Sequence, residues 1–285
     1  MGILVIGGAN IDVKAKTSAA HVSGTSNPGT VSIKAGGVAC NIAHNLARLN
    51  VETTLLSVIG NDTFGDMLLS ETHRAGVSTN HIIRTNQATG SYIAVLDERG
   101  ELIAAVSDME LLSFLTKEYI ADKNQLVKEN KYIIGDCNLS EETLAEIADQ
   151  AAERLIIEPV SVAKSKKLLS VLKNHRVFLA TPNLDQIEAL TGTREILIAT
   201  KVLHKLGLQN IVIHAGEQGA YVSDGNKITH VPSRARTIID VTGAGDAATA
   251  GLISGLLKNL PLAKAAEIGQ MIAAQVIASP SSTLD

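Results

Sequence analysis

The segment at residues 240–247 reads DVTGAGDA and stands just before an apolar helical pattern. If a helix begins near Gly243, its first backbone N–H groups have no partner within the helix and can bind an anion. The small residues Gly243, Ala244 and Gly245 would let a phosphate group approach these N–H groups closely. A bound phosphate would repel Asp246, but this carboxylate could accept the proton of an attacking hydroxyl. The spacing therefore indicates phosphoryl transfer to an alcohol, with Asp246 as base and the neighbouring N–H groups as an anion hole.

A helix cap is the simpler interpretation of the same segment. In that case Asp240 caps the turn, and Asp246 is an acid in the first turn of a helix, where acids are favoured. The chain contains no Gly-x-x-x-x-Gly-Lys-Ser/Thr pattern, which excludes a P-loop. Gly7 and Gly8 follow an apolar strand pattern but lack the spacing of a dinucleotide-binding loop. The surrounding elements have to decide between these interpretations.

Apolar runs of strand length alternate along the chain with helical patterns. Strands are predicted at 3–6, 53–59, 132–134, 155–157, 177–180 and 211–214, a hairpin at 220–231, and helices at 38–49, 64–74, 140–152, 161–173, 184–190, 196–206, 243–258 and 262–278. Such alternation predicts an α/β fold, with a mostly parallel sheet between two layers of helices.

Two segments interrupt the alternation. Residues 13–35 and 89–107 favour strands and show no helical pattern. We expect one domain, in which these segments form a small β-sheet lid on a core made of 1–12, 36–88 and 108–285. A lid would exclude water, which competes with the alcohol for the phosphoryl group. A small sheet with an apolar outer face often pairs with a copy of itself, which predicts a homodimer formed through the lid.

Polar or small residues follow several of the predicted strands. They are Asn10, Asp12, Asp136, Asn138, Glu158, Asn183 and Gly216. Ligands of such folds bind beyond the carboxyl ends of the strands, so this distribution indicates a polar cleft at one edge of the sheet. Each of these residues could also be an ordinary turn residue, and the distribution alone assigns no roles.

Composition excludes several classes of protein. The net charge of −4 argues against a nucleic-acid surface, and no apolar run approaches the ~18 residues of a membrane helix. Cys40 and Cys137 form no zinc pattern, and the N-terminal segment reaches glycine too early for a signal peptide. We therefore expect a cytoplasmic protein with reduced thiols, and neither a nucleic-acid nor a membrane partner.

Ordered motifs along almost the whole chain resemble the ribokinase-like, or PfkB, family of carbohydrate and nucleoside kinases. They are GGANIDV, AGGVACNIAHNLARL, TPNLDQIEALTG, HAGEQGAYV and DVTGAGDA. The resemblance implies a ribokinase-like fold, ATP as phosphate donor and Mg²⁺ as cofactor. It implies that the sugar or nucleoside contacts include Asn10, Asp12, Gly36, Gly37, Asn41 and Asn138, and that the nucleotide contacts include Asn183, His214, Gly216, Gly219 and Gln270. Asp108, where the predicted lid rejoins the core, is a further candidate for the substrate site.

The resemblance also raises the question of cations. Asp240 and Thr242 match positions that bind a monovalent cation in some relatives, which makes K⁺ a candidate. The family's Asn-x-x-Glu motif has Gln186 in place of its glutamate, and Glu188 two residues later could contact Mg²⁺ through water. A second departure is Cys40, where relatives of a narrower group carry a larger basic residue.

That narrower group is the pseudouridine kinases, which phosphorylate the 5′-hydroxyl of a C-nucleoside. The segments SNPGTVSIKAGGVACNIAHNLARL, VSDM, GDCNLSEE and EPVS resemble them. Ribokinase or another sugar or nucleoside kinase is the alternative within the family. A non-catalytic protein that senses a nucleoside or nucleotide on the same fold is the alternative from another class. Gln186 and Cys40 would allow a sensor, whereas Asp246 argues against one.

Overall fold

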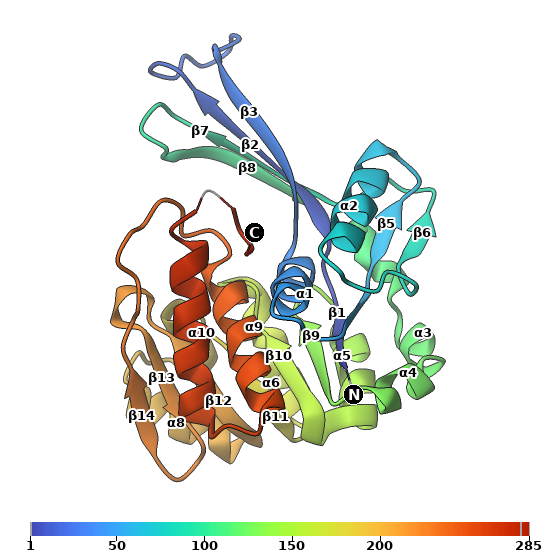
Figure 1. The fold of residues 1–285 in the computed structure, drawn as a ribbon, viewed down its shortest axis with the longest axis vertical. Helices are drawn as coiled ribbons and strands as arrows, with labels where there is room; N and C mark the ends of the chain where they lie inside the picture. The colour runs from blue at the N-terminus through green and yellow to red at the C-terminus, as the bar shows by residue number, and fades with distance from the viewer. Residues whose placement is uncertain (1, 280, 285) are drawn as a thin grey trace.

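An eight-stranded sheet forms the centre of the computed structural model, which describes residues 2–279 and 281–284 (Figure 1). Its strand order is β14-β13-β12-β11-β10-β9-β1-β4. The bounds are β1 (Ile3–Ile6), β4 (Thr53–Leu56), β9 (Tyr132–Asp136), β10 (Leu155–Glu158), β11 (Val177–Ala180), β12 (Leu208–His214), β13 (Ala220–Ser223) and β14 (Ile228–Val231). Neighbouring strands from β4 to β12 are parallel, and β13 and β14 form the predicted antiparallel hairpin at one edge. The expected mostly parallel sheet is confirmed.

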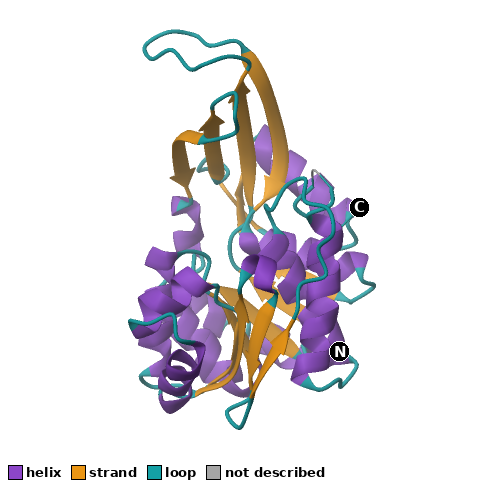
Figure 2. Ribbon diagram, turned by 90° about the vertical axis from the view of Figure 1, so that its left-hand side faces the viewer, coloured by secondary structure: helices purple, strands orange, loops and turns teal. Residues whose placement is uncertain are grey.

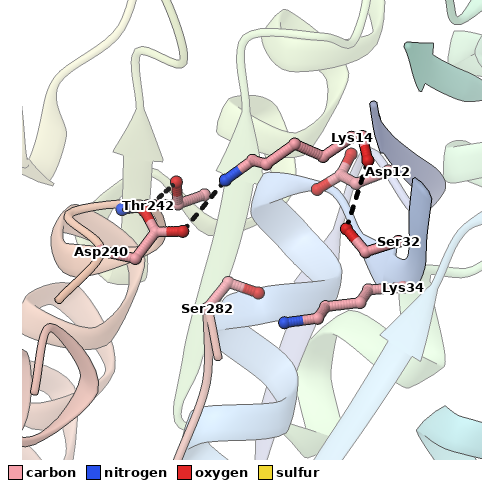
Figure 3. Close-up of a pocket in the computed structure, with 7 residues that line it drawn as sticks. All are labelled: Asp12, Lys14, Ser32, Lys34, Asp240, Thr242 and Ser282. Carbon is pink, nitrogen blue, oxygen red and sulfur yellow. Dashed lines mark hydrogen bonds and ion pairs between the residues drawn. The ribbon is translucent and has the colours of Figure 1, made fainter. Parts of the chain in front are cut away.

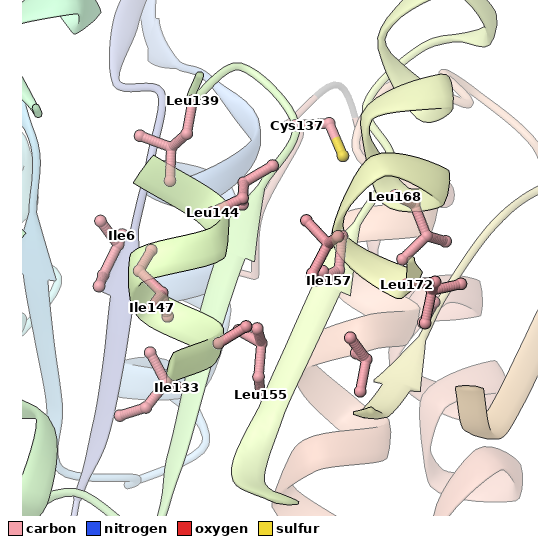
Figure 4. Close-up of a cluster of buried hydrophobic side chains, with 14 of the residues drawn as sticks. Ile6, Ile133, Cys137, Leu139, Leu144, Ile147, Leu155, Ile157, Leu168 and Leu172 are labelled. Carbon is pink, nitrogen blue, oxygen red and sulfur yellow. The ribbon is translucent and has the colours of Figure 1, made fainter. Parts of the chain in front are cut away.

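Helices cover both faces of this sheet (Figures 1 and 2). One face carries α3 (Lys117–Ala121), α4 (Asn124–Glu129), α5 (Glu141–Ala151), α6 (Val162–Leu172), α7 (Leu184–Thr191) and α8 (Ile196–Lys205). The other face carries α1 (Val38–Arg48), α9 (Ala244–Leu257) and α10 (Leu262–Val276), with α2 (Thr63–Arg74) beside them. Ile6 points to the first face, in the cluster of Figure 4, and Val5 to the second, because successive strand side chains alternate.

The helices α9 and α10 lie side by side and contact each other through glycines (Figure 1). A Cβ atom on Gly251 would lie 2.8 Å from the Cα atom of Gly269, and one on Gly255 would lie 2.7 Å from the Cα atom of Ala265. Both distances are shorter than real Cβ contacts, so the two backbones approach each other as closely as only glycine allows. This contact fixes the position of α9 relative to α10.

A separate four-stranded sheet projects from the core (Figures 1 and 2). Its order is β3 (Gly29–Gly36), β2 (Asn10–Thr17), β7 (Ser91–Leu96) and β8 (Leu102–Asp108). We call it the small sheet. It is formed by the two segments that were expected to contain strands and no helices, and β7 and β8 pair antiparallel as a hairpin. The register places Val13 beside Ile33 and Ile93 on one face, and Lys14 beside Ser32 on the other.

Several short elements had no counterpart in the sequence patterns. They are β6 (Ile83–Thr85), the helices α3 and α4, and the 3₁₀ turns Glu110–Phe114, Ala152–Arg154 and Gly216–Gln218. The strand predicted at 53–59 is divided into β4 and a separate strand, β5 (Val58–Gly60), which pairs in parallel with β6. Within the described part of the chain, no helix has both the length and the apolar character needed to cross a membrane.

Candidate active site

The helix α9 begins within the DVTGAGDA segment, as expected. Gly243 is its N-cap residue and has a left-handed φ of 79°. A Cβ atom on Gly243 would collide with the carbonyl oxygen of Ser282, whereas one on Gly245 would meet nothing within 4 Å. The N–H group of Ala244 donates to the carbonyl oxygen of Val241, but those of Gly245 and Asp246 have no hydrogen bond within the described residues. The N–H groups of Gly245 and Asp246 are therefore available to an anion at the positive end of the helix.

Asp246 lies in the first turn of α9 and contacts α1 through one hydrogen bond. The side-chain amide of Asn41 donates from Nδ2 to Asp246 Oδ2 at 2.9 Å. The other side of the Asn41 amide, the Oδ1 atom, is buried and has no hydrogen-bond partner within residues 2–279 and 281–284. Buried acceptors are almost always satisfied in folded proteins, so Oδ1 is suited to a donor supplied by a ligand, such as a hydroxyl group.

Carboxylates from neighbouring strand ends surround Asp246. Burial raises the pKa of Asp246 well above its usual value, and the negative charges of Glu158, Asp136 and Asp12 raise it further, against the effect of the Asn41 hydrogen bond. Burial also raises the pKa of Glu158, to about 7, and those of Asp136 and Asp12. A carboxylate with a raised pKa is a stronger proton acceptor once it is ionised, and this cluster would be stabilised by a nearby cation.

An open cleft of about 440 Å³ lies between the small sheet and the core. Its lining residues are Asn10, Asp12, Gly37, Val38, Asn41, Tyr92, Ser107, Met109, Asn138, Val160, Ser161 and Lys164. Five of the residues expected at the substrate site, Asn10, Asp12, Gly37, Asn41 and Asn138, are therefore brought together here. The side-chain amide of Asn10 donates to Asp12 Oδ1 at 2.6 Å, which orients both side chains.

The two adjacent glycines explain how this cleft stays open. Gly37 has a φ of 95°, and a Cβ atom there would lie 2.6 Å from Asn10 Oδ1. A Cβ atom on Gly36 would collide with the carboxylate of Asp12. Gly36 does not itself line the cleft, but its lack of a side chain lets Asp12 lie against the start of α1.

Asp108 is not among the residues that line the cleft, although Ser107 and Met109 are. The register places Ser107 opposite Tyr92 and Asp108 opposite Ser91. Because successive strand residues point to opposite faces, Asp108 projects away from Tyr92 and the cleft. Its Oδ1 atom accepts a hydrogen bond from the N–H group of Glu110, as a turn residue would.

A second, smaller pocket of about 80 Å³ lies at the start of α9. It is lined by His214, Gly216, Gly219, Ala244, Gly245, Ala248, Gln270 and Ala273. Every residue expected at the nucleotide site except Asn183 is in this set, and Asn183 forms a parallel β-bridge with His214. Burial lowers the pKa of His214 to about 4, so its ring is neutral at physiological pH and offers hydrogen bonds rather than charge.

The structure does not bring Gln186 and Glu188 to either pocket. Gln186 is buried in a capping box with Asn183, in which its Oε1 atom accepts from the Asn183 N–H group at 2.8 Å. The carboxylate of Glu188 accepts from Nε of Arg194 at 2.6 Å. No set of three or more His, Cys, Asp and Glu side chains in the described ranges is arranged to hold a metal ion. The carboxylate of Glu158, at the end of β10, accepts a hydrogen bond from Thr181 Oγ1 at 2.6 Å.

Asp240 and Thr242 border a third pocket, of about 310 Å³, with Asp12, Lys14, Ser32, Lys34 and Ser282 (Figure 3). Asp240 Oδ1 accepts from the N–H group and the hydroxyl of Thr242, at 2.9 and 2.6 Å. Its Oδ2 atom pairs with the ammonium group of Lys14 at 2.9 Å. Although partial burial acts to raise the pKa of Asp240, the Thr242 bonds and Lys14 lower it to about 2.

Cys40 lies in the core and not in the cleft. Its Sγ atom is 3.3 Å from Nε2 of His44 and 3.7 Å from the Thr72 hydroxyl. Burial raises the pKa of this thiol to about 12, so it is protonated and unreactive. The cysteine that replaces the larger basic residue of the narrower group is therefore buried beside His44 and Thr72.

Lysines of the site were not foreseen from the sequence. Lys164, in the first turn of α6, lines the cleft and donates from Nζ to Asn138 Oδ1 at 2.6 Å. A cation in the first turn of a helix is unfavourable, because it opposes the helix dipole. This unusual position was the one feature of the sequence that could have indicated a role for Lys164. Lys14 carries no local signal at all, because its partner Asp240 is 226 residues away in the chain.

Residues 2–285 match the family model described as pfkB family carbohydrate kinase. Pseudouridine kinase of Escherichia coli (strain K12) is 36% identical, over 94% of this chain and 88% of that protein, and an uncharacterized sugar kinase of the same organism is 32% identical, over 98% and 78%. A carbohydrate kinase from Agrobacterium tumefaciens, 30% identical, superposes with a TM-score of 0.86 over 99% and 93% of the two chains. Ribokinase from Thermotoga maritima, 22% identical, gives a TM-score of 0.88 over 99% and 94%, which confirms the expected ribokinase-like fold. The chain belongs to the pfkB family of carbohydrate kinases.

Proposed function

We propose that this kinase transfers the γ-phosphoryl group of ATP to the 5′-hydroxyl of pseudouridine. The observation that carries the proposal is the position of Asp246 between two pockets. Ala244 and Gly245, its neighbours in α9, line the smaller pocket, and Asn41, its hydrogen-bond partner, lines the larger cleft. Two curated relatives, from Escherichia coli and Arabidopsis thaliana, are named pseudouridine kinase, which favours this acceptor over other nucleosides and sugars.

In the proposed mechanism, polar groups of the cleft hold the ribose hydroxyls. Asn10, Asp12 and the unsatisfied Oδ1 atom of Asn41 would fix the ring, so that the attacking oxygen lies against Asp246. Asp246 accepts the proton of this hydroxyl as the bond to phosphorus forms. The free N–H groups of Gly245 and Asp246 stabilise the charge on the transferring group.

Mg²⁺ would accompany ATP in this reaction, and the chain offers groups that fit it. The ion keeps several of its own waters and takes one or two carboxylates and the phosphates of its substrate. Glu158 and Asp136 are opposite each other on β10 and β9, and the charge of Asp136 adds to burial in raising the pKa of Glu158. Glu158 and Asn183 are the residues we expect at its water shell, where the ion would neutralise phosphate charge.

The small sheet is proposed to be the lid of the cleft and the contact surface of a homodimer. Its outer face exposes Val31, Ile33, Ile93 and Val106, by 65, 43, 41 and 65%. A contiguous β-branched surface of this kind is a typical interface between copies of one chain. Introducing charge through Ile93→Lys and Val106→Asp should therefore yield a monomer in light scattering. Leu197→Lys, which adds charge at an exposed residue of α8, should leave the mass unchanged, and a monomeric parent protein would contradict the proposal.

A substrate panel with coupled ADP detection tests the acceptor. We expect the highest kcat/KM with pseudouridine, and lower values with uridine, adenosine and ribose. A flat response to pseudouridine beside good turnover of ribose or adenosine would make the chain another sugar or nucleoside kinase of the family. ATP binding without ADP formation from any acceptor would favour the sensor alternative.

A further inference from the structure

Lys14 reaches from the small sheet to the segment that leads into α9 (Figure 3). Asp240 and Thr242 were expected to hold a monovalent cation. The carboxylate of Asp240 already has a cation within hydrogen-bond distance, since Lys14 Nζ lies 2.9 Å from Oδ2. Its other oxygen accepts two bonds from Thr242.

We propose that the ammonium group of Lys14 replaces the monovalent cation at Asp240, so that this kinase does not depend on K⁺. A lysine ammonium and a potassium ion carry the same charge, and both need oxygen partners. The two cannot share one carboxylate oxygen without mutual repulsion. The kinetic test of this inference rests on the proposed kinase activity. The contact between Lys14 and Asp240 is independent of that activity.

The strand register explains why Lys14 points to this place. Lys14 lies opposite Ser32, and Asp12, two residues earlier on the same face, lies opposite Lys34. This face of the small sheet is the one that meets the core, because its residues line a pocket with Asp240, Thr242 and Ser282. The outward face carries the apolar residues described above, so the location of Lys14 follows from the alternation of β2.

The ion pair connects two parts of the candidate active site. Asp12 is part of the cleft and lies two residues before Lys14 on β2. Asp240 and Thr242 stand directly before Gly243, the N-cap residue of α9. Lys14 is therefore a positioning residue, which holds the turn before the anion hole at a fixed distance from the substrate contacts.

The expected contribution to folding is small. The side chains of Lys14 and Asp240 are 43% and 28% exposed, and pairs that are exposed to this extent contribute little to the free energy of unfolding. Loss of the pair should thus displace the turn before α9 without unfolding the protein. A loss of kcat in a variant that remains folded would distinguish a positioning role of Lys14 from a merely structural one.

The test compares the parent protein with Lys14→Met and Lys14→Arg in K⁺ and in tetramethylammonium, which is too large for a cation site, at equal ionic strength. The parent's kcat should differ by less than about twofold between the two salts, since Lys14 supplies the charge. Lys14→Met should lose roughly two- to fivefold in kcat without K⁺, the factor expected when a partly exposed pair is lost, and regain most of it when K⁺ is added. Lys14→Arg should behave as the parent. The control is Lys16→Met, which removes an exposed lysine of the same strand and should change nothing.

A second readout does not require turnover. K⁺ should raise the midpoint of thermal unfolding of Lys14→Met but not that of the parent, because only the variant has a vacant position beside Asp240. Strong activation of the parent by K⁺ would overturn the inference, and so would a Lys14→Met protein that resembles the parent in both salts. If no acceptor is phosphorylated, the proposed function fails, but the thermal measurement still decides whether Lys14 replaces the cation.

Discussion

Replacing Asp246 with Asn should lower kcat by about 10²- to 10⁴-fold, the range expected when a general base is removed, while ATP still binds. The substitution keeps the size of the side chain, and its carbonyl oxygen can still accept the hydrogen bond from Asn41 Nδ2. What is lost is the ability to accept a proton from the acceptor hydroxyl. Steady-state kinetics and calorimetric titration with ATP measure the two effects separately.

The pH dependence of kcat/KM provides an internal check on the same residue. Burial and the charge of Glu158 raise the pKa of Asp246, so the base is protonated and inactive at acid pH. Activity should therefore rise with pH through a range above that of an ordinary carboxyl group, and Asp246→Asn should lose this rise. Asp108→Asn serves as the matched control, since Asp108 does not line the cleft, and it should retain the parent's rate and profile. Unchanged turnover in Asp246→Asn would refute the assignment of the base.

Replacing Gly243 with Ala should lower kcat by about 10²- to 10³-fold, the cost of losing anion-hole donors. The reason is steric, because the added Cβ atom would collide with the carbonyl oxygen of Ser282 and displace the start of α9. The residue also has a φ of 79°, which costs a non-glycine residue about 1–2 kcal/mol. Kinetics and chemical denaturation together measure the change in the site and the change in the free energy of unfolding.

Gly192 provides the matched control for this second substitution. It ends α7 with a φ of 76°, and a Cβ atom there would meet nothing within 4 Å. Gly192→Ala therefore carries the same backbone strain without the collision, and it should lose stability but keep its kcat. If both variants kept their activity, the N–H groups at the start of α9 would not be an anion hole.

The central architecture could be predicted because its elements are long enough to show their period. The helix predicted at 262–278 is found as Leu262–Val276, and the hairpin at 220–231 as β13 and β14. The strand β6 has three residues and the helix at Lys117–Ala121 has five, and neither contains a continuous apolar run or a repeated helical spacing. Elements of that length are shorter than the window in which periodicity can be recognised, so only the surrounding packing specifies them.

The candidate site could be predicted in part, because its residues follow strands or sit in short motifs. Asn10 and Asn41 line the cleft, and Asp246 accepts a hydrogen bond from Asn41, as their positions in the sequence suggested. The sequence could not reveal that Arg194 pairs with Glu188, or that the alternation of β8 turns Asp108 away. Both depend on the direction in which one side chain points, and that direction is set by the packed structure.

The glycine contact between α9 and α10 limits how the pocket proposed for the nucleotide can adapt. The walls of this pocket that contain Gly245 and Gln270 belong to two helices whose backbones touch at Gly251 and Gly269. These walls cannot separate or slide without breaking that contact. If this pocket holds the phosphate donor, as proposed, a preference for a different donor would arise from changes of side chains around it rather than from movement of the two helices.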